Sequence, residues 1–248
     1  MEPIKNSSLQ VVAKNSILKY IKENTFSNNK LPTEEMFSEM LGISRVTIRS
    51  VLNELASEGF IFRKHGKGTF VNMEALKIKT PITPLKPFYS MITDLGYECQ
   101  IEDLGYEILE ASEVVAKNLN INFGEKVVFT KKVFYADNNP VVYCEDYFPL
   151  NFLKETDDCF KIKDYKYSIF QFIKEKCKKE VSWDKIEIAT VTTGEKKELE
   201  DIFRFDKVKA ILQCSGINYD DNNIPIVYAI EYVDTKYISF SLIRKKSI

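Results

Sequence analysis

The sequence has few of the residues on which most enzymes and metal sites depend. Its 248 residues include one histidine and five cysteines, and no two cysteines form a C-x-x-C pair. The histidine is His65, so the C-terminal half cannot contain a Ser-His-Asp or Cys-His arrangement. Zinc sites need spaced cysteines or histidines, and cofactor sites often carry a G-x-G-x-x-G or P-loop motif. We therefore predict no metal and no cofactor.

Long apolar runs and a disulfide framework are also missing. The sequence contains no run of 18 or more apolar residues, and its N-terminus has no apolar signal-peptide core. An odd number of cysteines argues against paired disulfides and favours a reducing compartment. We expect a cytoplasmic protein with no membrane partner. Hydrophobic residues make up 44% of the chain, enough to fill the cores of one large or two ordinary domains.

Two helix patterns separated by a short corner follow residue 31. In "LPTEEMFSEML", Thr33 is a good N-cap and two glutamates stand in the first turn, where the helix dipole favours acids. After Gly42, Ser44 is the N-cap of a second helix predicted over residues 45–58. Two helices joined by a three-residue turn that contains glycine are typical of a helix-turn-helix.

Basic and hydroxyl residues occupy the first turns of that second helix, and "FIFRKHGKGTFV" follows it. This segment has two β patterns around a glycine loop and predicts a wing. Arginine can bind guanine through two hydrogen bonds, whereas hydroxyls and lysines more often bind phosphate. We predict base reading by Arg45 and Arg49, and phosphate contacts by Ser44, Thr47 and Lys67. Taken singly, each of these residues would be an ordinary surface residue. Their common location, on a capped second helix followed by a glycine wing, favours a role in DNA binding.

The segment from "LPTEEMF" to "GKGTFV" resembles the winged-helix reader of GntR-type bacterial transcription regulators, over residues 10–71. Glu35 departs from that family, because its position often carries an arginine that contacts DNA, and an acid there would repel phosphate. His65 is equally compatible with a solvent-exposed turn. The resemblance implies contacts to double-stranded DNA by Ser44, Arg45, Thr47, Arg49, His65 and Gly66.

A proline-containing connection follows the wing. Pro81, Pro84 and Pro87 recur at spacing three and favour an extended, stiff linker. We expect a DNA-binding domain at 1–72, a linker at 73–88 and a second domain at 89–248. Residues 1–76 carry ten Lys and Arg against eight Asp and Glu, so charge permits DNA binding without demanding it.

The rest of the chain alternates β patterns with single helices and contains an internal repeat. "YADNNPVVYCEDYF" and "YDDNNIPIVYAIEYV" share their turn and tyrosine spacing about 85 residues apart. Two related halves therefore predict one mixed, mostly antiparallel sheet with helices packed on it, and an α+β fold for the whole chain. Predicted strands cover 98–109, 127–135, 141–148, 185–191, 210–219, 224–232 and 238–243, and predicted helices cover 112–119, 168–178 and 195–203.

Residues 89–245 resemble the UTRA effector-binding domain of the HutC branch of that family. The resemblance implies a chorismate-lyase-like α/β fold that binds a small effector, such as a sugar, a sugar phosphate or a similar metabolite, and forms a homodimer. A dimer matches the two half-sites of a palindromic operator. Many relatives carry an R-x-R pair where this chain has Lys132 and Phe134. One ammonium lacks the bidentate fork of a guanidinium, so a less anionic ligand is expected.

Five more residues are candidates for effector binding. Ser168 opens a predicted helix, where it would bind an anion or simply cap the helix. Glu145 and Glu187 would accept hydrogen bonds from sugar hydroxyls, or face solvent. Tyr143 and Tyr228 occupy equivalent repeat positions and would either flank one cavity or pack in the sheet.

These observations predict a metabolite-responsive transcription regulator, more often a repressor than an activator, and not an enzyme. Two alternatives stay open. A small-molecule enzyme that uses paired carboxylates could be fused to the winged helix, and would turn its ligand over repeatedly. A winged helix that contacts RNA or protein would bind weakly, without sequence preference and without a response to metabolites.

Overall fold

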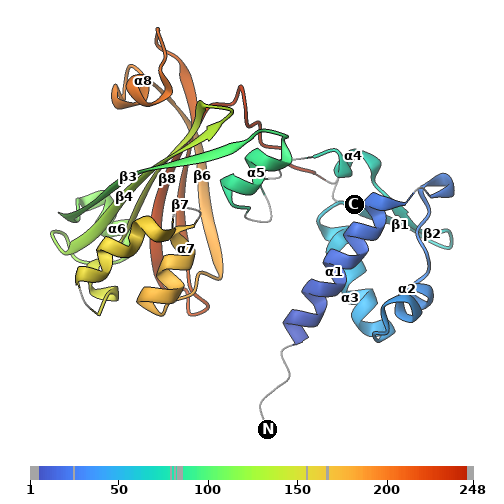
Figure 1. The fold of residues 1–248 in the computed structure, drawn as a ribbon. Coiled ribbons are helices and arrows are strands. Elements are labelled where there is room, and N and C mark those ends of the chain that lie inside the picture. Colours follow the sequence, from blue (N-terminus) through green and yellow to red (C-terminus); the bar gives the residue numbers. More distant parts are fainter. Residues whose placement is uncertain are drawn as a thin grey trace. The chain divides into compact units, whose positions relative to one another are not determined.

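The computed structural model describes residues 6–24, 26–78, 80, 82, 86–154, 156–165 and 168–244. The chain forms two compact units, shown in Figure 1. Met1–Thr83 together with Ser241–Ile248 make the N-terminal unit, and Pro84–Phe240 make the C-terminal unit.

The N-terminal unit is a three-helix bundle followed by a hairpin. α1 (Asn6–Glu23), α2 (Glu34–Leu41) and α3 (Arg45–Ser57) precede the antiparallel strands β1 (Ile61–Lys64) and β2 (Gly68–Val71). A short 3₁₀ turn, η1 (Ser27–Asn29), joins the first two helices. The predicted helix-turn-helix and wing are therefore both present. The buried core contains Ile17, Phe37, Ile48, Leu52, Leu55 and Ile61.

The capping signals explain where these helices start. Thr33 accepts a hydrogen bond from the Met36 amide, and Ser44 accepts one from the Thr47 amide at 3.2 Å. Gly42 then closes α2 with a φ of 65°, in the left-handed region that glycine adopts without strain. The tight corner before α3 follows from these three residues.

The C-terminal end of the chain returns to the N-terminal unit. The Ser241 amide donates to the Thr80 carbonyl, and the Ile82 amide donates to the Ser241 carbonyl. The strand predicted over 238–243 is wrong, because only Ser241 forms a bridge and residues 238–240 have no regular structure. A lone extended segment becomes a strand only if a neighbouring strand accepts it, and the sequence does not report that neighbour.

The connection at 73–88 is partly helical rather than extended throughout. α4 (Met73–Leu76) stands within it, and Pro87 is the N-cap of α5 (Phe88–Asp94). Pro81 and Pro84 lie outside the described residues.

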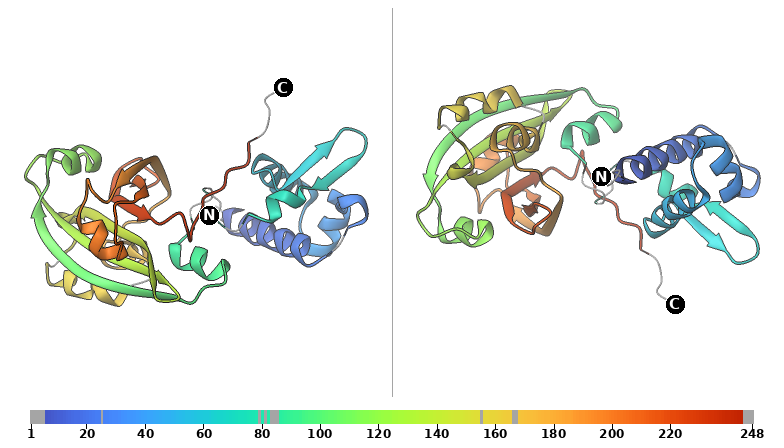
Figure 2. Two further views of the ribbon diagram at one scale, coloured as in Figure 1. Left: turned by 90° about the horizontal axis from the view of Figure 1, so that it is seen from above. Right: turned by 90° about the horizontal axis from the view of Figure 1, so that it is seen from below.

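The C-terminal unit is built on one six-stranded antiparallel sheet, seen from two further sides in Figure 2. The strand order is β3-β4-β5-β8-β7-β6. In that order the strands are Cys99–Glu110, Lys126–Ala136, Asn139–Pro149, Pro225–Val233, Ala210–Tyr219 and Trp183–Thr192.

The sheet consists of two related halves. Strands β3, β4 and β5 of the first half correspond to β6, β7 and β8 of the second, and the two halves meet where β5 pairs with β8. Tyr143 lies opposite Tyr232, and Tyr147 lies opposite Tyr228. Tyr143 is equivalent to Tyr228 in the sequence repeat, and Tyr147 to Tyr232, so each tyrosine faces the non-equivalent tyrosine of the other half across the centre of the sheet.

Helices cover both faces. α6 (Glu113–Leu119) and α8 (Glu198–Phe203) pack on the face that carries Tyr143 and Tyr228, which we call the α6–α8 face. α5 and α7 (Ile169–Phe172) pack on the other, the α5–α7 face.

Irregular helical segments complete the unit. The helix predicted over 168–178 changes from α7 to the π-helical turn η4 (Ile173–Cys177). Two 3₁₀ segments, η2 (Leu150–Phe152) and η3 (Thr156–Tyr165), lead from β5 towards α7.

Candidate DNA-reading surface and effector site

Three arginines meet two glutamates on the surface formed by α2, α3 and the wing. Arg45 Nη1 lies 3.3 Å from Glu35 Oε1, and Arg49 Nε lies 2.9 Å from Glu34 Oε2. Arg63, on wing strand β1, places Nη2 3.1 Å from Glu34 Oε1. The Glu34 carboxylate therefore holds together Arg49 of α3 and Arg63 of the wing. The two predicted readers and Arg63 occur on one surface.

Arg63 and Glu34 were missed by sequence reasoning. A signal was available, because Arg63 lies in the predicted β pattern two residues before His65, where the glycine loop of the wing begins. Exposed ion pairs contribute only about 0–1 kcal/mol to stability. A phosphate or a base can therefore replace the glutamate partners of these arginines at little cost to the fold.

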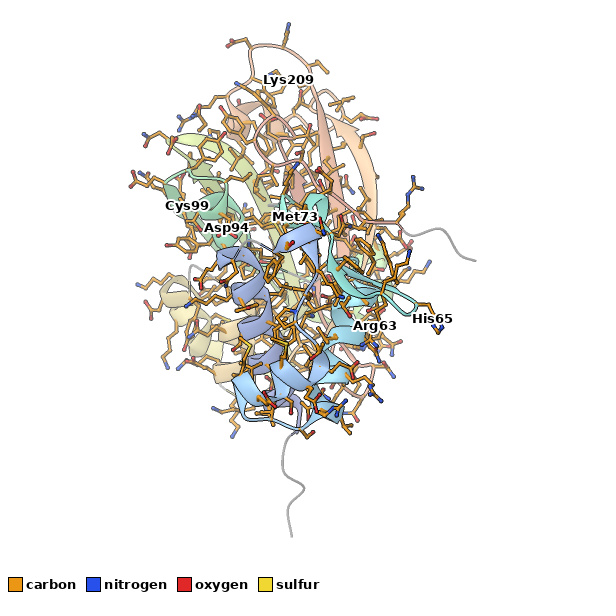
Figure 3. The ribbon with its side chains drawn as sticks, turned by 90° about the vertical axis from the view of Figure 1, so that its right-hand side faces the viewer. Arg63, His65, Met73, Asp94, Cys99 and Lys209 are labelled. Carbon is orange, nitrogen blue, oxygen red and sulfur yellow. The ribbon has the colours of Figure 1, made fainter. Side chains whose placement is uncertain are left out.

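The other predicted DNA contacts are divided between α3 and the wing. The Ser44 hydroxyl caps α3 and lies 2.9 Å from the Thr47 hydroxyl, so both hydroxyls already make hydrogen bonds at the start of the helix. His65 is exposed at the tip of the hairpin, as Figure 3 shows. Gly66 has a φ of 68°, and the Lys67 amide closes the turn on the Lys64 carbonyl.

The six predicted effector residues do not share one face of the sheet. Lys132 pairs with Cys144 and lies on the α5–α7 face. Tyr143 and Glu145 lie on the opposite face with Tyr228, because side chains alternate along a strand. Tyr228 stacks on Tyr147 and packs in the apolar cluster under α6.

The remaining two residues are separate from that cluster. Glu187 is exposed on β6 and forms an ion pair with its neighbour Lys185. Ser168 is the N-cap residue of α7, yet its side chain makes no capping hydrogen bond. The Lys132 ammonium and the Ser168 amide both donate to the Tyr165 carbonyl, each at 3.2 Å. The structure thus brings Lys132 and Ser168 to one point.

Two acids, Asp146 and Glu231, lie on the α5–α7 face with Lys132. Lys132 is 3% exposed and Asp146 is 7% exposed. Burial raises the pKa of Asp146 to about 6, although the nearby Lys132 ammonium lowers it. Loss of water on burial, together with the nearby carboxylates of Asp146 and Asp184, raises the pKa of Glu231 to about 8. At neutral pH a protonated Glu231 can both donate and accept hydrogen bonds.

Asp146 and Glu231 were also missed. The repeat contained the signal, because the two acids occupy equivalent positions in the two halves. Lys132, Asp146 and Glu231 together offer one cation, one partly ionised acid and one neutral acid. Such a set suits a ligand with several hydroxyls better than a dianionic phosphate.

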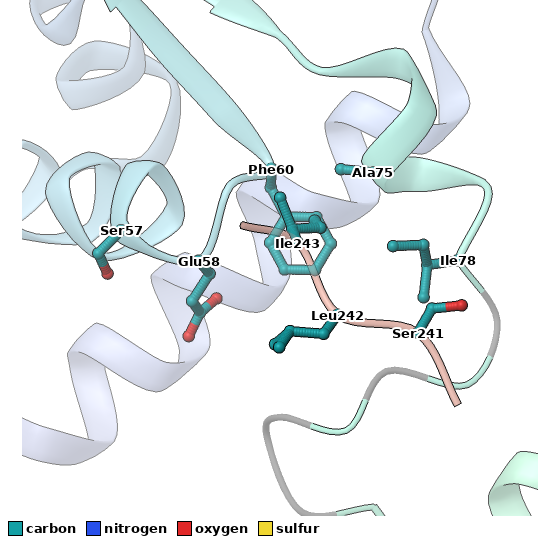
Figure 4. Close-up of a pocket in the computed structure, with 8 residues that line it drawn as sticks. All are labelled: Ser57, Glu58, Phe60, Ala75, Ile78, Ser241, Leu242 and Ile243. Atoms are coloured by element: carbon teal, nitrogen blue, oxygen red, sulfur yellow. The ribbon is translucent and has the colours of Figure 1, made fainter. Parts of the chain in front are cut away.

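A pocket of about 280 Å³ lies within the N-terminal unit, at the end of α3 (Figure 4). Ile243 occupies the space beside Gly59, where an added Cβ would be 2.7 Å from Ile243 Cγ2. The pocket is lined by Ser57, Glu58, Phe60, Ala75, Ile78, Ser241, Leu242 and Ile243.

Two further findings concern the described part of the chain. None of its helices is long and apolar enough to cross a membrane. Within the same residues, no three or more His, Cys, Asp or Glu side chains are placed to hold a metal ion.

A winged helix joined to a helix-covered antiparallel sheet defines a class of two-domain bacterial regulators. Two family models match this chain: bacterial regulatory proteins, gntR family, over residues 11–71, and the UTRA domain over residues 94–239. The chain belongs to the GntR family of transcription regulators that carry a UTRA domain, and is a metabolite-responsive regulator.

Two relatives and one solved structure are similar to this chain. The chain is 29% identical to the "Uncharacterized HTH-type transcriptional regulator YurK" of Bacillus subtilis, over 61% of this chain and 62% of that protein. It is 25% identical to the "Probable fructoselysine utilization operon transcriptional repressor" of Shigella flexneri, over 89% of this chain and 87% of that protein. The crystal structure of "possible transcriptional regulator YydK" from Bacillus subtilis matches 95% of this chain and 99% of its own chain, with a TM-score of 0.75 at 19% identity. This match shows that the two proteins share a fold.

Proposed function

We propose that this protein is a cytoplasmic repressor that binds a palindromic operator as a homodimer and responds to a hydroxyl-rich metabolite. The observation that supports the DNA-binding part is the arrangement of Arg45, Arg49 and Arg63 around two glutamates. Two copies of this surface, related by a two-fold axis, would match two half-sites.

In this proposal Arg45 and Arg49 read bases from α3, and Arg63 approaches the DNA from the wing. Ser44, Thr47, His65, Gly66 and Lys67 set the position on the phosphates. Glu34 orients Arg49 and Arg63 before DNA arrives. That arrangement reduces the side-chain entropy that binding has to remove.

The effector site of this proposal lies on the α5–α7 face, at Lys132, Asp146, Glu231 and Ser168. Lys132 would bind an anionic or carbonyl oxygen of the ligand, and the two acids would bind hydroxyls. Relatives named for fructoselysine use and for mannosyl-D-glycerate transport and metabolism support a sugar derivative. The effector would bind the DNA-incompetent arrangement more tightly, typically by about 1–3 kcal/mol.

Selection of genomic fragments by the purified protein tests the proposal. A recovered palindrome, bound with an affinity that falls steeply as salt rises, is the expected result. Sugar derivatives suggested by the neighbouring genes are then added, and one of them should release the DNA. Binding without sequence preference, or repeated conversion of the sugar derivative into product, would contradict the proposal.

A further inference from the structure

A second polar cluster lies on the α6–α8 face, opposite the proposed effector site. Tyr143, Glu145 and Tyr232 form it, and their exposures are 0%, 5% and 4%. The two tyrosine rings are stacked with centroids 5.8 Å apart, and the Tyr232 hydroxyl donates to the Glu145 carboxylate. The Tyr143 hydroxyl lies 3.1 Å from both Glu145 Oε1 and Glu198 Oε1, and donates to these carboxylates. We call Tyr143, Glu145 and Tyr232 the tyrosine cage.

Lys196, from the turn before α8, places its ammonium in the tyrosine cage. Its Nζ lies 4.4 Å from the Tyr232 ring centroid and 5.6 Å from that of Tyr143. The same atom donates to the Tyr232 hydroxyl at 3.0 Å and forms an ion pair with Glu145. Two ring faces and a carboxylate around one ammonium are the chemistry by which proteins recognise organic cations.

The other half of the sheet shows that the fold does not need a charge at this place. By the sequence repeat, Ala111 is the counterpart of Lys196, and Ile230 is the counterpart of Glu145. Ala111 is 1% exposed and packs with Tyr228 and Tyr147 in an apolar cluster. The tyrosines are therefore common to both halves, whereas the buried carboxylate and its cation are confined to one.

We propose that the tyrosine cage is a binding site for the primary ammonium group of an alkylamine, which Lys196 fills as an internal ligand. The Lys196 side chain is 27% exposed and leaves from a turn, so the cage can be reached from solvent. An amine that replaces it frees the turn before α8. Because a tethered group acts at an effective concentration on the order of millimolar, free amines bind the intact protein only weakly.

Butylammonium chloride is the probe for this site, since it is a primary ammonium on a four-carbon chain, like the whole lysine side chain. Lys196→Ala removes all of that side chain beyond Cβ. Thermal unfolding of full-length Lys196→Ala is measured against butylammonium at constant ionic strength, with sodium chloride and butanol as reference solutes. We expect a saturable rise in Tm with butylammonium alone, because the buried Glu145 regains a cation. The wild-type protein should bind the same amine at least about tenfold more weakly.

Two variants make the test specific. Lys185→Ala removes the partner of Glu187, which is exposed on the same sheet, and should show no saturable rise. Lys196→Ala combined with Glu145→Gln should lose the rise. Equal gains with sodium chloride or butanol, or equal affinity in wild type and Lys196→Ala, would overturn the proposal. If Lys196→Ala does not fold alone, butylammonium during refolding should restore the folded fraction, and failure to do so would also overturn it.

Discussion

The two units of this protein handle charge in opposite ways. In the N-terminal unit, Arg45 and Arg49 are more than half exposed and their partners lie on a neighbouring helix. In the C-terminal unit, Lys132 and Asp146 are almost fully buried. Water screens an exposed pair, so its loss changes binding more than stability. A buried charge that loses its partner costs several kcal/mol of stability. Substitutions of such groups should therefore change both the free energy of unfolding and ligand binding.

The largest effect is expected from Lys132→Ala. Asp146 would be left buried beside Glu231 without a cation, and the free energy of unfolding should fall by about 3–5 kcal/mol. Lys131→Ala is the matched control, because Lys131 is adjacent in sequence but on the other face, in a half-exposed pair with Glu107. Chemical denaturation of both variants measures the difference. Equal losses would mean that the buried cluster has no special cost.

Arg49→Ala should change operator affinity and leave the fold intact. The loss of a base contact is expected to cost about 1–3 kcal/mol of binding and to relax specificity at one operator position. Thermal unfolding should move little, since the Arg49–Glu34 pair is exposed on the arginine side. Anisotropy titrations on a set of single-base operator variants give the answer. Unchanged specificity would remove Arg49 from the base readers.

Glu231→Gln should flatten the pH dependence of stability. The pKa of Glu231 is raised from 4.5 to about 8, so the unfolded chain releases this proton at a lower pH than the folded chain. The contribution of Glu231 to the free energy of unfolding is therefore fully present below pH 4.5. It declines as pH rises towards 8, by at most about 1.4 kcal/mol per pH unit. Denaturation curves at pH 5, 6, 7 and 8 should show that slope in wild type and a smaller slope in Glu231→Gln. Parallel curves would contradict it.

Gly59→Ala tests the returning C-terminal segment within the N-terminal unit. Gly59 and Gly42 both have positive φ, but an added Cβ contacts Ile243 only at Gly59. Both substitutions carry backbone strain of roughly 1 kcal/mol. Gly59→Ala should cost a further amount that Ile243→Ala removes in the double variant. Equal melting temperatures for the two glycine variants would show that this contact adds nothing to stability.

The smallest effect on stability is expected from Glu35→Gln. Both side chains of the Glu35–Arg45 ion pair are exposed, so the free energy of unfolding should hardly change. Operator affinity should rise several-fold at low salt, because a negative charge is removed from a surface that meets phosphate. The gain should shrink as salt is raised. A loss of affinity would instead indicate that Glu35 contacts a base.

The N-terminal unit could be predicted almost residue by residue, because its signals are local. Capping by Thr33 and Ser44, the glycine at 42 and the turn at His65 each act within four residues. Arg63 was missed since its partner Glu34 is far away in sequence and near only after α2, α3 and the wing have packed.

The repeat and the antiparallel sheet of the C-terminal unit were also within reach of the sequence, but the composition of its sites was not. The reason is one irregular pairing. A regular hairpin continuing from the Ala136–Asn139 pair would place Lys132 opposite Tyr143, on the same face. The register shifts between Phe134 and Tyr135, so Lys132 pairs with Cys144 instead. A shift of one residue moves every side chain beyond it to the other face.

The amino-acid sequence by itself therefore determined the helix-turn-helix, the wing, the duplicated strands and the family, since these depend on local spacing and composition. Tertiary structure decided which charges meet. It set Arg63 beside Arg49 through Glu34, and it separated Lys132 from Glu145 by the thickness of the sheet. Such choices depend on strand register and helix packing, which are settled by the free energy of the whole unit rather than by any one segment.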